Sequence, residues 1–200
     1  GYPDGLKYLW KLEELSGNVA IPTYGTVHGR SVNCTLDQTG KVGKCYSFNG
    51  TSSYIVFTNI GLTTFSISLW YYIATGHGNS NYDRIFGMTG YRFELAYFGT
   101  GFAIYDGVWH TGLGTFTLDT WHHLVITKST SGYIFYLNNL PVYSPTKSLT
   151  INTTDDIYIG AATGSPATSY IAGLIDQISY YDVQLDSDAV ADLYNAGNGI

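Results

Sequence analysis

Alternation of apolar and polar residues with a period of two constrains this chain more than any other feature. FSISLWYY (residues 65–72) places large apolar residues at every second position, and RFELAYF (92–98) and GFAIYD (101–106) repeat the pattern. Such alternation puts successive side chains on opposite faces of an extended strand. Other segments predicted as strands are CYSFNG, SYIVF, RIFGM, GTFTL, HHLVITK, GYIFYL, LPVYS, DIYIGA and GLIDQISYY. Many short strands separated by Gly, Asn, Asp and Thr turns predict an all-β fold, with two antiparallel sheets packed as a β-sandwich.

The length and charge of the chain narrow the possible classes of protein and partner. Its 200 residues fit a single domain, which we place at 1–200. Nine Lys and Arg residues and a net charge of −6 give no basic surface for a phosphate backbone, so we expect no nucleic-acid partner. All apolar runs are short, and we expect no insertion into a membrane. The chain opens GYPDGLKYLWKL without Met or a signal-like stretch, which we interpret as a mature form or an excised domain.

One short helix is predicted near the C-terminus, in QLDSDAVADLYNAGNG (184–199). Asp186 or Ser187 can cap its first turn, and its apolar residues share one face. Gly197 is suited to a left-handed stop. A helix of this length needs packing partners, so we expect it to lie against the sandwich.

The two cysteines, Cys34 and Cys45, enclose the turn-rich stretch TLDQTGKVGK. This spacing is suited to a disulfide that closes a hairpin, and the alternative is two small buried thiols. We favour the disulfide, which is a slight indication of an oxidising, extracellular compartment.

Four segments, in order, resemble the laminin-G-like (concanavalin A-like) jelly-roll domains. GKVGKCYSFNGTSSYIVF (40–57) is similar to the family's opening motif and tyrosine strand, and FSISLWYYI (65–73) to its tryptophan strand. TWHHLVITK (120–128) and the hairpin after it resemble the Trp-His-His-Val strand and its neighbour. GLIDQISYYDVQLDSDAVADLYNAG (173–197) resembles the closing strand and terminal helix. The resemblance implies a jelly-roll sandwich with a short C-terminal helix, but this fold carries lectins, adhesins, laminin-type modules and some hydrolases.

The chain departs from the family's pattern at two places. Its hairpin turns on Asn138-Asn139 instead of Asp-Gly, and Asn tolerates the positive φ that the turn requires. The family's Phe-Asp-Gly is Phe48-Asn49-Gly50, which removes a carboxylate where a calcium ligand is expected.

The adjacent histidines His122 and His123 are the most conspicuous candidates for metal or acid–base chemistry. On a strand they point to opposite faces, so they cannot share one metal ion without a bulge. The resemblance implies that one ring packs inside and one lies at the surface. We interpret both as structural.

The sequence does not show the pattern of carboxylates that catalysis by this fold needs. Glycoside hydrolases with this fold use two or more carboxylates on one strand face. Here Glu94 stands alone in RFELAYF and Asp176 stands alone in GLIDQISYY. We therefore predict that the chain is not an enzyme, and a hydrolase site assembled from loop aspartates is the third-ranked alternative.

Asp176 is the candidate for a structural metal. In the strand alternation it falls on the same face as Ile178 and Tyr180, which predicts that its carboxylate points inward. The buried charge would then have to be compensated by hydrogen bonds from backbone amides or by a calcium ion. The resemblance implies calcium near the closing strand, with Asp176 and either the Asn49 side chain or the Gly50 carbonyl as ligands. A hydrogen-bonded Asp176 without metal is the equal alternative.

The outer surface of the central strands is the predicted ligand site, since an exposed aromatic ring can stack on a sugar while polar groups bind its hydroxyls. Trp109, in GVWHTG, belongs to no apolar alternation and is the best single candidate. The segment 79–84 is predicted as an adjacent rim. The residues predicted to bind ligand are Trp109, Tyr105, Asp106, His110, Arg92 and Glu94.

These observations predict a non-catalytic carbohydrate-binding or adhesion module of a larger secreted or surface protein. The expected partner is a glycan or a surface protein, at an extracellular, cell-surface or virion-surface location. The main alternative is a structural or protein-interaction domain, for instance one displayed on a virion or phage.

Overall fold

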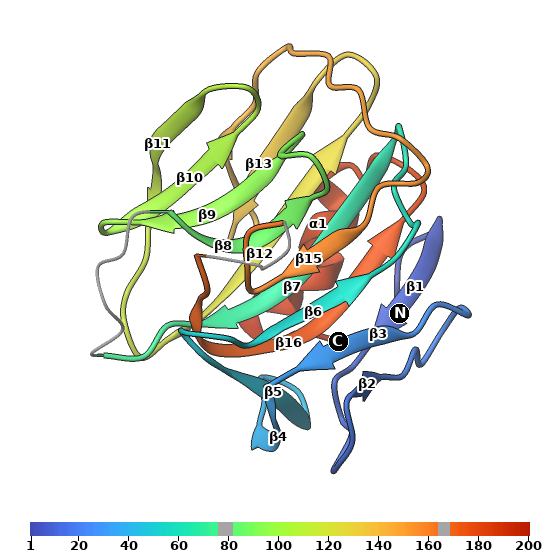
Figure 1. Ribbon diagram of the computed structural model, residues 1–200. Helices are drawn as coiled ribbons and strands as arrows, with labels where there is room; N and C mark the ends of the chain where they lie inside the picture. Colours follow the sequence, from blue (N-terminus) through green and yellow to red (C-terminus); the bar gives the residue numbers. More distant parts are fainter. Residues whose placement is uncertain (76–81, 164–168) are drawn as a thin grey trace.

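A computed structural model describes residues 1–75, 82–163 and 169–200. Two antiparallel sheets pack face to face as a sandwich, and one short helix lies behind them in the view of Figure 1. The predicted jelly-roll β-sandwich with a short C-terminal helix is confirmed.

The first sheet, called the β7 sheet below, carries the strands nearest both chain ends. Its order is β14 (Leu140–Tyr143), β13 (Tyr133–Leu137), β12 (Trp121–Lys128), β7 (Phe65–Tyr72), β16 (Ala172–Tyr181), β5 (Lys44–Asn49) and β4 (Thr35–Thr39), with β1 (Leu6–Trp10) also paired to β16.

The second sheet, called the β8 sheet, runs in the order β11 (Trp109–Thr115), β10 (Gly101–Tyr105), β9 (Glu94–Phe98), β8 (Asp83–Met88), β15 (Ile157–Ile159), β6 (Tyr54–Phe57), β3 (Gly29–Val32) and β2 (Val19–Ala20). Its strands come from four separate stretches of sequence. The topology places β15 between β8 and β6, so β6 and β15 pair although about 100 residues separate them in the chain.

The core lies between the inner faces of the two sheets. Alternate residues of β7, beginning with Phe65 and Ile67, face Phe86, Leu95 and residues of neighbouring strands. The period-two pattern of 65–72 thus selects the buried face as predicted. The side chains between these positions point outward, where they are available for other contacts.

A bulge in β16 reverses this alternation. Gln177 has φ 51°, and the pairing of β16 with β7 shifts between Asp176 and Ser179. Ile175 and Ile178 consequently both face the core, although three positions separate them. The predicted inward orientation of Asp176 is wrong, because the bulge leaves it opposite Trp70 on the outer side of the β7 sheet.

Helix α1 (Ser187–Tyr194) is followed by the 3-10 turn η1 (Asn195–Gly197). The Asp186 carboxylate accepts a hydrogen bond from the Ala189 amide at 2.9 Å, which confirms it as the N-cap. The predicted stop at Gly197 is wrong, since Asn195 (φ 47°) takes the left-handed position and ends the helix.

Residues of α1 cover the outer side of the β7 sheet in a second apolar cluster. It consists of Val125, Tyr136, Tyr181, Leu185, Val190 and Leu193. No helix in the described part of the chain has the length and apolar character needed to cross a membrane.

The predicted disulfide is not formed, and the alternative of two thiols holds. β4 pairs with β5 so that Thr35 lies opposite Ser47, which leaves Cys34 and Cys45 separated by about 10 Å along the strands. That exceeds the Cα separation of about 7 Å that a disulfide can bridge. Both are free thiols whose pKa is raised by burial, to about 11 for Cys34 and about 12 for Cys45.

Substitution of the N-cap should destabilise the protein. In Asp186→Ala the first turn of α1 loses its capping hydrogen bond, and we expect the free energy of unfolding to fall by about 1 kcal/mol in urea titrations. Ser187→Ala is the matched control, because Ser187 is exposed and makes no capping bond. Equal losses in the two variants would contradict the assignment of the cap.

Candidate functional site

Four half-buried aromatic rings gather on the outer side of the β8 sheet, and we call them the Trp109 cluster. Tyr82 stacks on Trp109 with ring centroids 4.0 Å apart and on Phe98 at 4.4 Å. Tyr105 lies 5.2 Å from Trp109. The pairing of Tyr105 with both Glu94 and Trp109 fixes this arrangement, because paired residues share a face.

An ion pair lies against this cluster. The Arg84 guanidinium sits 4.8 Å from the centre of the Trp109 ring, and its Nε donates to Glu94 Oε2 at 3.2 Å. Arg84 also donates through Nη1 to the Tyr82 carbonyl. The aromatic rings and the ion pair are therefore held in one network, in which the cation–π contact orients the guanidinium.

Glu94 is almost fully buried, with 1% of its surface exposed. Burial raises the pKa of its carboxyl, and Arg84 opposes this shift. Its Oε1 has no hydrogen-bond partner, and neither does the buried Oγ1 of Thr163. Gly87 lies beside both side chains, since a Cβ there would meet Glu94 Oε1 at 3.5 Å and Thr163 Cγ2 at 3.6 Å. Glu94 Oε1 thus borders this position without a partner, and Thr163 approaches it through its methyl group.

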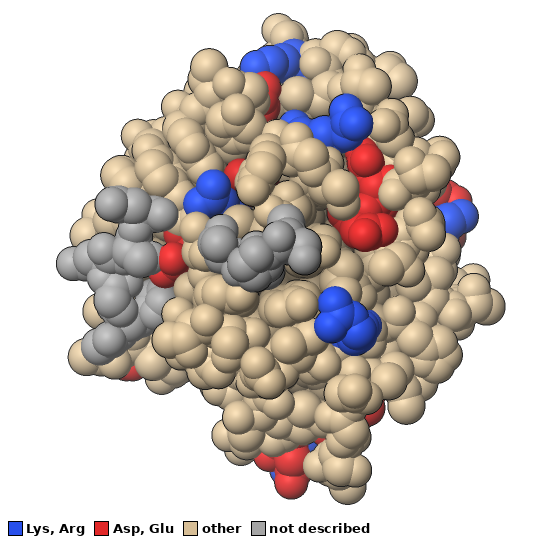
Figure 2. Space-filling model, in the orientation of Figure 1, with Lys and Arg blue, Asp and Glu red and all other residues tan. Residues whose placement is uncertain are grey.

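The outer side of the β8 sheet carries few basic side chains. Figure 2 shows this side of the molecule, on which Lys and Arg are isolated, some Asp and Glu gather in one patch, and most of the visible surface comes from uncharged residues. A surface of this kind favours stacking and hydrogen bonding over long-range electrostatic attraction.

The predicted ligand-binding residues divide into three groups. Trp109, Tyr105 and Glu94 come together as expected. Asp106 and His110 belong to a separate network at the sandwich end, and Arg92 pairs with Asp155 at 3.1 Å. Within the predicted rim at 79–84, positions 79–81 lie outside the described residues.

Asp106 has a structural role at the end of β10. Its carboxylate accepts hydrogen bonds from His110 Nε2 and Lys147 Nζ, both at 2.9 Å, and from the Tyr133 hydroxyl at 2.8 Å. Burial alone would raise the pKa of Asp106, but these three donors outweigh it and hold the pKa below its usual value. With its oxygens occupied in this way, Asp106 closes one end of the sandwich and leaves little capacity for a ligand.

Arg84 was not among the predicted residues. Its strand parity is that of Phe86 and Met88, which face the core, so the alternation in DRIFGM contained no signal for an outward Arg84. The bulge between Arg84 and Phe86 reverses the alternation and places Arg84 opposite Ala96 on the outer side of the sheet.

The two histidines point to opposite faces of β12, as predicted. His122 faces the interior, where its Nε2 donates to the Thr117 carbonyl at 2.9 Å and its Nδ1 accepts from Asn138. His123 faces the other side, and its Nε2 lies 2.7 Å from Ser68 Oγ. The expectation that one ring lies at the surface is wrong, because α1 covers His123 and burial lowers its pKa to about 3.

The residues predicted to bind calcium do not converge. Asn49 pairs with Ala172, four residues from Asp176, which is about 13 Å along the strand. The Asn49 Oδ1 already accepts hydrogen bonds from the amides of Thr51 and Ser52 in its own turn. Across the described ranges, no group of three or more His, Cys, Asp and Glu side chains could hold a metal ion. Asp176, Asn49 and Gly50 therefore do not fit a calcium site.

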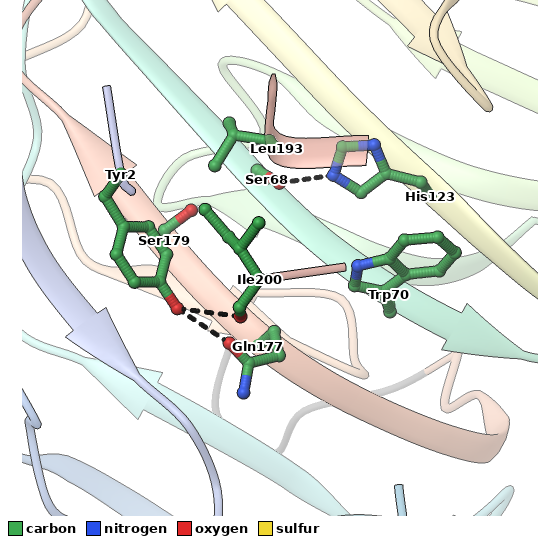
Figure 3. A pocket seen from close by; sticks show the side chains of 8 residues that line it. All are labelled: Tyr2, Ser68, Trp70, His123, Gln177, Ser179, Leu193 and Ile200. Carbon is green, nitrogen blue, oxygen red and sulfur yellow. Dashed lines mark hydrogen bonds between the residues drawn. The ribbon is translucent and has the colours of Figure 1, made fainter. Parts of the chain in front are cut away.

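A small polar cavity lies beneath α1 on the outer side of the β7 sheet (Figure 3). It has a volume of about 10 Å³, which is room for a single water molecule and too little for a sugar. In Figure 3, the Tyr2 hydroxyl points to Gln177 Oε1 at 2.8 Å and to the Ile200 carbonyl, and His123 points to Ser68. The residues lining it are Tyr2, Ser68, Trp70, His123, Gln177, Ser179, Leu193 and Ile200.

A sequence model of the concanavalin A-like lectin/glucanases superfamily, of the laminin G type, matches residues 49–191. The chain belongs to this family. The match includes the tryptophan strand, the Trp-His-His strand and most of the closing helix, on which the resemblance rested.

Solved structures with the same fold include a sialidase of Trypanosoma rangeli in complex with 2,3-difluorosialic acid, with a TM-score of 0.76 and 17% identity over 98% of this chain and 34% of the sialidase chain. Domain 4 of AbnA, a GH43 extracellular arabinanase from Geobacillus stearothermophilus, in complex with arabinotriose, has a TM-score of 0.66 and 19% identity over 94% of this chain and 97% of that domain. The chain thus spans about a third of the sialidase structures. None of the curated protein sequences matches it.

The pH dependence of stability should depend on Asp176. Burial raises its pKa to about 7, whereas an unfolded Asp has a pKa near 3.8. Between these values the unfolded chain releases the proton that the folded protein retains, so the free energy of unfolding falls as pH rises. We expect Asp176→Asn, which resembles the protonated acid, to gain roughly 2–4 kcal/mol relative to the wild type between pH 4 and pH 8.

Urea titrations at both pH values measure this difference. Asp192→Asn is the control, since Asp192 is an exposed carboxylate on α1. A stability difference between Asp176→Asn and the wild type that stays constant with pH would contradict the account.

Proposed function

We propose that the chain is a non-catalytic glycan-binding module and that the Trp109 cluster is its binding site. The observation that carries the proposal is the contact between a half-exposed aromatic platform and a fixed ion pair on the open outer side of the β8 sheet. The flat ring of Trp109 suits the C–H face of a pyranose or furanose ring. Arg84 then supplies donors and Glu94 an acceptor for the sugar hydroxyls.

Unsatisfied polar side chains support a polar ligand. Glu94 Oε1 and Thr163 Oγ1 are each buried without a partner, and hydroxyls of a sugar can donate to a carboxylate and accept from a threonine hydroxyl. An apolar ligand would leave both unpaired, at a cost of about 1–3 kcal/mol for each. The site therefore combines an apolar surface with a few placed polar groups, which is the usual composition of a small-molecule site.

A structural neighbour supports the choice of ligand class. The domain of AbnA that shares this fold is described in complex with arabinotriose, so a domain of this architecture can hold an oligosaccharide. That arabinanase is described as extracellular, and the sialidase chains are about three times the length that this chain covers. Both facts favour a module of a larger secreted or surface protein.

The absence of catalysis is part of the proposal. Glu94 pairs with Arg84, and among the carboxylates of the described residues none is recorded in contact with it, whereas a glycosidase needs two facing carboxylates to share the acid and nucleophile roles. Turnover of an oligosaccharide by the purified protein, lost in Glu94→Gln, would contradict this part.

Substitution of the platform should weaken glycan binding without unfolding the protein. We expect Trp109→Ala to weaken binding of the glycans selected from a printed array by about 10- to 100-fold, because a buried aromatic anchor typically contributes 2 kcal/mol or more. Affinity is measured by titration calorimetry and stability by thermal melting.

Trp121→Ala is the matched control. Trp121 is also half-buried, but it packs on Tyr72 in the other sheet, where it is the first residue of β12. Equal loss of affinity in both variants, or an array on which the wild-type protein binds no glycan, would contradict the proposed function.

A further inference from the structure

A second aromatic group lies on the outer side of the same sheet, on strands that are remote in sequence from the Trp109 cluster. Tyr54 of β6 stacks on Tyr158 of β15 with ring centroids 5.8 Å apart, and Tyr170 lies 6.4 Å from Tyr54. All three rings are half-buried. We call them the Tyr54 cluster.

Arg30 of β3 completes this group. Its guanidinium lies 5.6 Å from the centre of the Tyr54 ring, and its Nη2 is 3.3 Å from the Tyr54 hydroxyl. Arg30 is exposed, and the cation–π contact limits the directions in which its remaining donors point.

The three arginines of the chain differ in their partners. Arg84 pairs with Glu94 and Arg92 with Asp155, both of them buried carboxylates. Arg30 has no carboxylate partner among the residues that the structure describes. In a chain of net charge −6, it is the arginine whose charge a ligand could neutralise.

The two aromatic clusters are continuous. Arg84, which touches the Trp109 ring, forms a parallel β-bridge with Tyr170, and Tyr170 contacts Tyr54. Five strand spacings separate β11 from β6 in the sheet order, so the whole track is about 24 Å long. A monosaccharide can occupy only one end of a track of this length.

We propose that the Tyr54 cluster with Arg30 is a second subsite, and that the ligand is an extended oligosaccharide that lies across the strands and places an anionic group against Arg30. This rests on the proposed function. The tyrosine rings offer a second stacking platform, and the guanidinium fork binds a carboxylate or a sulfate through two parallel hydrogen bonds. The overall negative charge of the protein disfavours anions elsewhere on its surface, so recognition of the acidic unit depends on this position.

The test uses a printed array that carries neutral glycans, their carboxylated counterparts and their sulfated counterparts, each as a series from disaccharide to hexasaccharide. We expect the wild-type protein to prefer the longer members and, among these, the carboxylated or sulfated ones. The two acidic arms distinguish the source of the negative charge.

Three variants test which residues produce the preference for acidic glycans and for longer glycans. Arg30→Gln should weaken binding of the preferred acidic hexasaccharide about tenfold and leave its neutral counterpart unchanged. Tyr158→Ala should reduce the gain in affinity from disaccharide to hexasaccharide, while Tyr158→Phe keeps it because the ring remains. Lys7→Gln is the charge-matched control, since Lys7 makes a surface ion pair with Asp182 on the other sheet.

The outcomes separate the two proposals. If Trp109→Ala weakens binding, but binding shows neither length dependence nor sensitivity to Arg30→Gln, the second subsite is overturned and the proposed function stands. An array without any bound glycan overturns both. Equal affinity for neutral and acidic glycans would overturn the proposal that the ligand carries an anionic unit. Binding of a protein ligand through Arg30, without binding of any glycan, would overturn the proposal that the ligand is a glycan.

Discussion

Packing of α1 against the outer side of β12, β13 and β16 determines which surface of the sandwich can receive a ligand. Val190 and Leu193 of the helix bury Val125, Tyr136 and Tyr181 of the strands beneath it. Since each fully buried side chain of this size contributes about 1.5–3 kcal/mol, displacement of the helix by a ligand would be costly. The cavity left under the helix holds about one water molecule, and both described helical segments lie on this side. The opposite outer surface, on the β8 sheet, is therefore the one left for a partner.

The bulge at Gln177 leaves the carboxylate of Asp176 buried in an unfavourable environment outside the sandwich core. It turns Asp176 out of the core, but the loop at Gly40–Val42 covers the carboxylate, so that Oδ2 accepts from the Val42 amide while Oδ1 has no partner. A buried carboxylate with one unsatisfied oxygen is disfavoured in its charged form, which explains the raised pKa. A calcium ion would relieve this, but the neighbouring side chains do not supply the ligands. Asp176 thus limits stability at neutral pH and contributes nothing to the proposed site.

Much of the fold and half of the site could be predicted from the sequence, because alternation within a strand is a local property. The pattern of 92–98 and 101–106 places Glu94 and Tyr105 on the outward face, and the short turn before Trp109 brings it back beside Tyr105. Asp106 follows the same alternation, but as an inward residue at a strand end, where Tyr133 and Lys147 reach it from other strands and loops.

The remaining errors arise from properties that a single sequence does not display. The bulge in β16 occurs at Asp176-Gln177 without a glycine, so nothing in the pattern indicates the reversal. The separation of Cys34 from Cys45 follows from the register of β4 against β5. The Tyr54 cluster depends on the neighbouring positions of β6 and β15, which only the topology of the whole sheet defines.

The central claim is that glycans bind to the outer side of the β8 sheet, and the four tryptophans of the chain report on it directly. Trp10 and Trp70 are buried, Trp121 is the first residue of β12 in the β7 sheet, and Trp109 is in the proposed site. Titration of a glycan into ¹⁵N-labelled protein, followed by the indole N–H signals, distinguishes these positions. The account predicts a saturable shift of the Trp109 signal while those of Trp10 and Trp70 stay in place. Binding that shifts the Trp70 or Trp121 signal and leaves that of Trp109 unmoved would contradict it.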